Sequence, residues 1–94
     1  MRTPEDVIRE RAGMKPFGFD NVHLYRLEGT QFGFSEEFDP YAGWLWVVSV
    51  PLGRITAAKP TIAAIEKEFG KPYDTWKGMV CRFYAWKIPG RSEA

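Results

Sequence analysis

The sequence predicts a small α+β domain, in which an antiparallel sheet of four or five strands is accompanied by two helices. Apolar residues recur every three or four positions over residues 58–69, which indicates a helix, and every second position over 79–88, which indicates a strand. Residues 44–50, WLWVVSV, are β-branched and aromatic and predict a further strand. The 94 residues fit a single domain, residues 1–94.

The first element predicted is an N-terminal helix. Thr3 is a good cap, Pro4 suits the first helical position, and the acidic residues that follow favour the positive end of the helix dipole. Gly13 ends the pattern. The helix has barely three turns, so it must pack on the rest of the domain, and we expect it to shield an edge or end of the sheet.

A connector whose Phe17 and Phe19 are expected to fill the core leads into a predicted β-hairpin. Its strands are 22–27 and 30–34, and Gly29 supplies the turn because glycine tolerates positive φ. A second glycine at position 33 weakens the returning strand.

Residues 35–43 are predicted to form a solvated acidic loop. Glu36, Glu37 and Asp39 carry the oxygen ligands that hard cations prefer. Their spacing matches no calcium-binding loop, so we expect no metal site here.

The second half of the chain contains the strongest predicted elements. Strand 44–50 is expected to be central and covered on both faces, or to present its tryptophans to a partner, and 54–56 are a further candidate strand. From Pro60 a helix is expected, ended by Gly70, and its apolar stripe consists of Ala58, Ile62, Ile65 and Phe69.

Composition excludes several classes of protein. The net charge of +1 is unlike that of a histone-like cation or an acidic DNA mimic. Residues 1–40 carry five basic and eight acidic side chains and residues 41–94 carry eight and four, so positive charge lies in the half that also holds the tryptophans. No apolar run approaches the ~18–20 residues of a membrane span, and the N-terminus lacks the apolar region of a signal peptide. We therefore expect a cytoplasmic protein.

Catalysis has little support in the sequence. His23 is the only histidine and lies in a predicted strand without a neighbouring nucleophile, and Cys81 alternates with apolar residues as a buried structural thiol does. No phosphate-binding loop, nucleophile elbow or zinc-protease motif occurs. The sequence predicts a protein that is not an enzyme and needs no cofactor or metal.

The last strand carries the candidate binding site. Alternation places Arg82, Tyr84 and Trp86 on one face, an aromatic platform beside a guanidinium of the kind that holds single-stranded nucleic acid. On the alternative interpretation, the rings cover the N-terminal helix or a second layer and Arg82 lies at the rim. Nearby lysines add positive charge to this face: Lys71, Lys77 and Lys87. Trp44 and Trp46 share one face of their own strand and extend the platform if the two strands pair. Trp76 is expected to pin the connection between helix and strand.

Aromatic residues make up 16% of the chain, more than a core of this size hides, and surface rings are typical of binding sites and oligomer interfaces. The alternative function is therefore a protein-binding module or a homodimer.

The second half of the chain contains a short ordered motif, aromatic-Gly, acidic residue, Trp-x-Gly, strand, formed by Phe69-Gly70, Asp74, Trp76 and Gly78. With this motif, the part of the chain from Lys59 to Trp86 resembles small phage-encoded proteins. Met79 stands where a lysine usually follows the glycine, and Pro72-Tyr73 occupies a place that is often acidic.

The resemblance implies an OB-like, partly open barrel and accessory work in replication or recombination. The predicted order of three strands, a helix and a further strand agrees with such a barrel, and a small open sheet with two helices on one face is the competing architecture. The implied partner is single-stranded nucleic acid. A host defence or nucleic-acid-processing machine that the protein inhibits is the alternative partner, in either case in the cytoplasm of the host cell.

Overall fold

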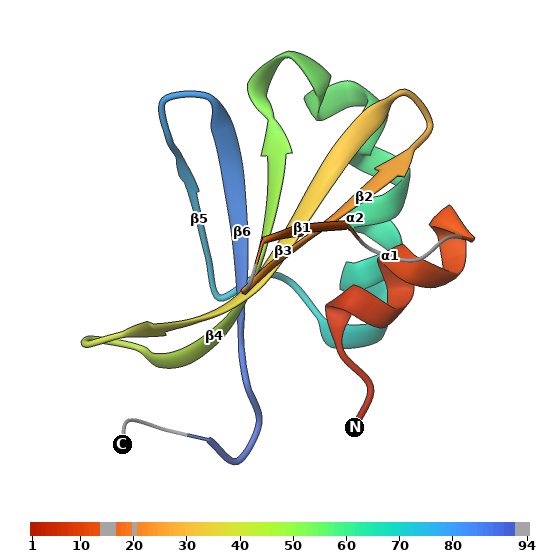
Figure 1. The fold of residues 1–94 in the computed structure, drawn as a ribbon. Helices are drawn as coiled ribbons and strands as arrows, with labels where there is room; N and C mark the ends of the chain where they lie inside the picture. The colour runs from red at the N-terminus through yellow and green to blue at the C-terminus, as the bar shows by residue number, and fades with distance from the viewer. Residues whose placement is uncertain (14–16, 20, 92–94) are drawn as a thin grey trace.

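The computed structural model describes residues 1–13, 17–19 and 21–91, and residues 17–19 as backbone. Two α-helices pack on one face of an antiparallel sheet, which confirms the predicted α+β class (Figure 1). Along the chain the elements are α1 (Pro4–Ala12), β1 (Phe17–Phe19), β2 (Val22–Leu27), β3 (Thr30–Asp39), β4 (Gly43–Pro51), η1 (Leu52–Arg54), α2 (Ile55–Phe69), β5 (Asp74–Lys77) and β6 (Cys81–Lys87).

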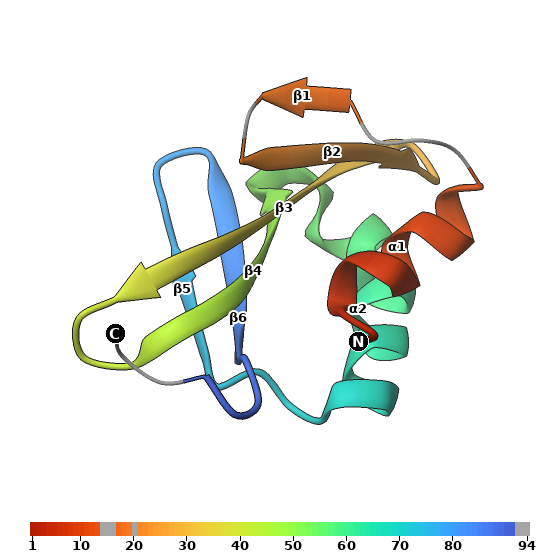
Figure 2. The same ribbon diagram turned by 60° about the horizontal axis from the view of Figure 1, so that its bottom comes forward.

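The sheet is open. Its strand order is β1-β2-β3-β4-β6-β5 and every neighbouring pair is antiparallel, with β1 and β5 at the two ends. Of the two predicted architectures, the open sheet with two helices on one face is therefore the one observed. Counting the three-residue β1, the sheet has six strands. Helix α2 connects β4 to the β5–β6 hairpin, so β6 adds to the sheet beside β4 and β5 becomes the outer strand (Figures 1 and 2).

Helix α1 begins and ends as its sequence predicts. The Asp6 carboxylate accepts a hydrogen bond of 2.8 Å from the backbone N–H of Thr3, and Gly13 ends the helix at a φ of 65°. Its buried Val7 and Ile8 join the core, and the helix contacts α2, β2 and β4, so it lies over one face of the sheet.

The β2–β3 hairpin is confirmed. Glu28 and Gly29 both have positive φ, of 51° and 78°, and Leu27 pairs with Thr30, which is the geometry of a tight two-residue turn. Gly33, expected to weaken β3, has a packing reason: a Cβ at this position would collide with the side chain of Ser49 on β4.

The prediction of a loop over residues 35–43 is wrong. Strand β3 continues to Asp39 and β4 already begins at Gly43, and the two strands pair from Gly33 with Ser49 to Asp39 with Gly43. The Asp39 carboxylate closes the turn by accepting hydrogen bonds from the backbone N–H groups of Tyr41 (2.7 Å) and Ala42 (3.1 Å). The acidic side chains are compatible with a strand here because Glu36 and Glu37 are exposed.

Helix α2 begins earlier than predicted, and the candidate strand 54–56 is wrong. The predicted start at Pro60 agrees with the preference of proline for the first position of a helix, but the helix begins at Ile55 and contains Pro60. The apolar stripe explains the longer helix, because Ile55 packs against the core in continuation of Ala58 and Ile62.

Strand β4 is buried on both faces, as the first of its two interpretations predicted. Trp46, Val48 and Val50 face the main core between sheet and helices. On the opposite face, Leu45 and Val47 form a second, smaller cluster with Ala85. The side chains of Phe17 and Phe19, predicted to fill the core, lie outside the described residues. In the described part of the chain, no helix has the length and apolarity needed to span a membrane.

Candidate nucleic-acid interface

The predicted binding strand, β6, lies between β4 and the edge strand β5. Trp86 pairs with Trp46, Tyr84 with Val48, and Arg82 with Val50. Partners in an antiparallel register share a face, so the tryptophans of β4 lie on the same face as Tyr84 and Trp86 of β6. That face is the one on which the helices pack.

The two central tryptophans are core residues. Trp86 is 3% exposed and donates its indole N–H to the carbonyl oxygen of Gly70 at 2.9 Å, just after α2. Trp46 is 2% exposed, donates to Glu36 at 3.2 Å and meets Phe69 edge-on at 5.7 Å between ring centroids. The expectation that these rings form an exposed platform is therefore wrong, because α2 covers them.

The other predicted residues of this face are half-buried. Tyr84 packs against the core, and burial raises the pKa of its hydroxyl. Arg82 donates a long hydrogen bond of 3.4 Å to Thr75 on β5. Trp44 lies between Phe38, at 5.2 Å between ring centroids, and the guanidinium of Arg91, 4.4 Å above its ring.

Four of the predicted residues nevertheless meet at one pocket, where β6 runs past the start of β5. The last pair of the β5–β6 ladder is Asp74 with Ala85, so the end of β6 faces the chain segment that leaves α2. There a pocket of about 260 Å³, here called the aromatic–lysine pocket, is lined by Trp46, Phe69, Lys71, Tyr73, Trp86, Lys87 and Pro89.

Sequence reasoning missed Tyr73, the most accessible ring of this pocket. Tyr73 is 52% exposed, and the ammonium of Lys87 lies 4.4 Å from its ring centroid. Its backbone N–H donates to the carbonyl oxygen of Ala85 at 2.7 Å, which fixes the ring beside β6. The residue lies between helix and strand, outside any periodic pattern, and its only signal in the sequence is an aromatic residue two positions after a lysine.

The β5–β6 hairpin extends the positive charge beyond the pocket. The exposed Lys77 lies directly opposite Arg82, on the face of the hairpin that also carries Tyr84. On the other face Trp76, a member of β5 rather than a pin for the connection as predicted, stacks on Phe83 at 5.3 Å with 17° between the ring planes. Like charges opposite each other destabilise a strand pair, so an anion bound between Lys77 and Arg82 would relieve their repulsion.

The residues that carry the phage-protein resemblance have structural roles. Phe69 packs against Trp46, and Gly70 ends α2 at a φ of 84°, a backbone conformation that favours glycine. Asp74 accepts a hydrogen bond from the N–H of Thr75 at 2.8 Å. A Cβ at Gly78 would lie 2.7 Å from the ring of Phe83, so only glycine fits the turn of the hairpin.

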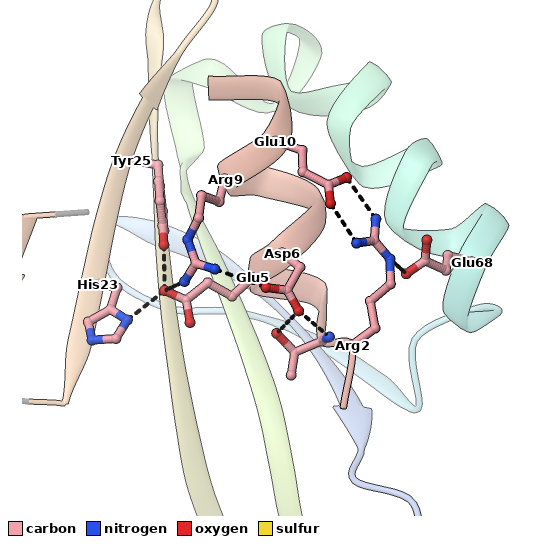
Figure 3. Close-up of polar contacts among 9 residues, drawn as sticks. Arg2, Glu5, Asp6, Arg9, Glu10, His23, Tyr25 and Glu68 are labelled. Atoms are coloured by element: carbon pink, nitrogen blue, oxygen red, sulfur yellow. Dashed lines mark hydrogen bonds and ion pairs between the residues drawn. The ribbon is translucent and has the colours of Figure 1, made fainter. Parts of the chain in front are cut away.

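A second polar cluster joins α1 to β2 (Figure 3). The Glu5 carboxylate accepts hydrogen bonds from Nδ1 of His23 and from the hydroxyl of Tyr25, both at 2.5 Å, and Arg9 lies 3.4 Å away. Burial raises the pKa of Tyr25 to about 12, with a further contribution from the hydrogen bond to Glu5, so the hydroxyl keeps its proton and donates. Glu5 thus holds the helix to the sheet.

The Glu5 cluster borders a polar cavity of about 320 Å³ to which Ser35 and Thr3 also contribute. No hydrogen bond joins either hydroxyl to His23 within the described residues, and the histidine ring is oriented by Glu5.

Cys81 is half-buried rather than buried as predicted. Within residues 1–13, 17–19 and 21–91, no three histidine, cysteine or acidic side chains gather in a way that could hold a metal ion.

Comparison of the chain with models of protein families, with curated proteins and with solved structures gives no match in any of the three.

Proposed function

We propose that this protein is a non-enzymatic accessory protein that binds single-stranded nucleic acid through the aromatic–lysine pocket and the β5–β6 hairpin. The observation that carries the proposal is the meeting of two lysines, Lys71 and Lys87, around aromatic rings at one pocket. The phage-protein resemblance suggests the setting, replication or recombination in the cytoplasm of a host cell.

The pocket has the chemistry of a site for one nucleotide. Bases stack on aromatic rings irrespective of sequence, and lysines neutralise the phosphates on either side. With about 260 Å³, the pocket suits a single planar group rather than an extended ligand, and Tyr73 is the ring that such a group reaches first. Trp46 and Trp86 form its buried wall.

The β5–β6 hairpin offers a positively charged surface for the rest of the bound nucleic-acid strand. Lys77 and Arg82 continue the positive charge along β5 and β6, so the phosphates that follow the bound nucleotide meet cations. Asp74 lies on the opposite face of β5 from Lys77, so its carboxylate does not interrupt this positive surface. Glu66 of α2 lies near Tyr84 and limits the path on the helix side.

Binding of a fluorescein-labelled oligothymidine, followed by fluorescence anisotropy, tests the proposal. We expect a dissociation constant in the micromolar range at ~50 mM salt and weaker binding at ~200 mM. Tyr73→Ala should weaken binding ~5- to ~150-fold, the equivalent of ~1–3 kcal/mol for one stacked base, whereas Tyr73→Phe keeps the ring and should bind as the wild type.

Lysine variants test the electrostatic part of the same experiment. The double variant Lys71→Gln, Lys87→Gln should lower the slope of log K against log salt by about 1.4, since each lost phosphate contact on a single strand contributes about 0.7. The matched control changes two exposed lysines of α2, Lys59→Gln and Lys67→Gln, and should retain the wild-type slope. Absence of binding by the wild type at low salt contradicts the proposal.

A second candidate function is protein binding, and the tip of the β5–β6 hairpin favours it. Met79 is 98% exposed and Val80 is 73% exposed, and all four residues of the edge strand β5 are exposed. Exposed apolar residues beside an open sheet edge are typical of a surface that meets another chain. The partner would be a host protein that the chain inhibits, or a second copy of the chain.

Capture from host lysate after nuclease treatment separates the two functions. A protein partner that remains bound to the wild type and is lost from the double variant Met79→Ser, Val80→Ser supports protein binding. Size-exclusion chromatography with light scattering tests self-association, and a strict monomer excludes the homodimer.

A further inference from the structure

The outer edge of β5 is an open strand edge. Among the described residues, β5 pairs with β6 on one side and with no strand on the other, and all four of its residues are exposed. Figure 2 shows β5 at the outer end of the sheet, on the side away from α1. Such an edge presents backbone donors and acceptors on which a further strand can pair.

The hydrogen bonds of the hairpin show which backbone groups of β5 point outward. The N–H of Gly78 donates to the carbonyl oxygen of Cys81 at 2.7 Å, and pairs along an antiparallel ladder alternate between hydrogen-bonded and non-hydrogen-bonded. Trp76 therefore belongs to a hydrogen-bonded pair, and its backbone groups point toward β6. The N–H and C=O groups of Thr75 and Lys77 consequently point to the open edge.

The Asp74 carboxylate agrees with this direction and limits access to the edge. It accepts a hydrogen bond of 2.8 Å from the backbone N–H of Thr75, a group that a neighbouring strand would otherwise take. Charged side chains at a sheet edge are a common means of limiting strand pairing. A further strand must therefore displace Asp74 from this N–H.

We propose that the occupant of this edge is β5 of a second copy of the chain, paired antiparallel about a two-fold axis at Trp76. In this register Thr75 of each copy lies opposite Lys77 of the other, so the outward groups of both residues are paired in both copies. A register centred on Thr75 would place Lys77 opposite Tyr73, whose N–H already donates to the carbonyl oxygen of Ala85 at 2.7 Å. A register centred on Lys77 would place lysine against lysine, which is destabilising.

The exposed side chains of β5 also fit a copy of themselves. Trp76 is 37% exposed and stacks on Phe83, which packs on the smaller cluster, on the sheet face away from the helices. The two Trp76 rings would face each other across the axis with a Phe83 behind each, and cross-strand aromatic pairs stabilise a sheet. Lys77, the kind of residue that protects an edge, faces the uncharged Thr75 of the other copy. Met79, 98% exposed, lies just beyond this ladder and adds apolar area.

The dimer deepens the second candidate function, protein binding, and rests on it, because it names a second copy as the partner. Specific interfaces bury about 1,200–2,000 Å² in total, more than a strand of four residues supplies, so we expect a weak dimer with a dissociation constant of about 10–100 μM. Sedimentation equilibrium from ~10 μM to ~1 mM measures this constant. A wild type that stays monomeric at the highest concentration overturns the dimer, whereas the capture experiment above decides protein binding separately.

Substitutions at two neighbouring residues should move the dimer in opposite directions. Thr75→Pro removes an outward N–H, which an edge strand tolerates, and should weaken dimerisation at least ~10-fold, whereas Thr75→Val keeps the N–H and should dimerise as the wild type. Asp74→Ala frees the N–H of Thr75 and should tighten the dimer about 3- to 10-fold. The matched control, Glu37→Ala, removes the same charge from an exposed position of β3 and should change nothing. A weaker dimer in Asp74→Ala, or an unchanged one in Thr75→Pro, contradicts the proposal.

Disulfide cross-linking tests the register itself. Facing residues of a non-hydrogen-bonded pair have Cα atoms about 4.5 Å apart, within the range that a disulfide bridges. In a Cys81→Ser background, Trp76→Cys should therefore form a covalent dimer in oxidised glutathione. Lys77→Cys lies two positions from its own copy along the paired strands and should cross-link at least ~10-fold more slowly. Equal rates, or faster cross-linking at position 77, would overturn the register.

Discussion

Trp86→Ala is expected to lower the free energy of unfolding by about 3–5 kcal/mol, the range for truncating a large buried aromatic side chain. The ring is 3% exposed and packs opposite Trp46 between the sheet and α2. Its indole N–H also donates to the carbonyl oxygen of Gly70 at 2.9 Å, so the substitution removes a side-chain hydrogen bond to the residue that ends α2. Urea unfolding followed by far-ultraviolet circular dichroism measures the loss.

Trp76→Ala is the matched control for Trp86→Ala. Trp76 lies on the edge strand β5, is 37% exposed and stacks on Phe83 alone among the described rings. Its loss is expected to cost about 1 kcal/mol, near the ~0.5–1.5 kcal/mol of an aromatic pair. Equal destabilisation by the two substitutions would show that Trp86 is not the core residue that its burial indicates.

The contrast between these tryptophans shows that a local sequence pattern predicts which side chains share a face of a strand, but not whether that face is buried. Alternation along 79–88 correctly placed Tyr84 and Trp86 on one face, because successive side chains of a strand point to opposite sides. Whether a face is covered depends on elements far along the chain. Trp86 is buried by α2, whose stripe of Ile62 and Ile65 was itself predicted, but no local pattern states which sheet face that stripe meets.

The errors in element boundaries have similar physical causes. The acidic residues of β3 disfavour a strand, and Pro60 disfavours the interior of a helix. In both elements the tertiary contacts outweigh these local preferences. Strand β5 has only four residues, too few for a periodic pattern, and it exists because it pairs with β6. The aromatic–lysine pocket is likewise formed by Tyr73 and Lys71 in a connection, where no period applies.

Glu5→Ala is expected to destabilise the protein by about 1–3 kcal/mol, the range for leaving a buried polar group without its hydrogen-bond partner. The substitution leaves the hydroxyl of the fully buried Tyr25 without its acceptor and removes the partner of His23 and Arg9 (Figure 3). Glu5→Gln keeps an acceptor for Tyr25 and should lose less. Circular dichroism during urea unfolding compares the three proteins.

Glu10→Ala is the control on the same helix, because Glu10 is exposed and pairs with Arg2 at the surface, so its loss should hardly move the unfolding midpoint. A double-mutant cycle of Glu5→Ala with Tyr25→Phe then isolates the buried contact. Since each substitution removes the same hydrogen bond, the double variant should lose less than the sum of the single losses, by about 1 kcal/mol or more. Additive losses would mean that Glu5 stabilises α1 through Arg9 and His23 and not through the buried hydroxyl of Tyr25.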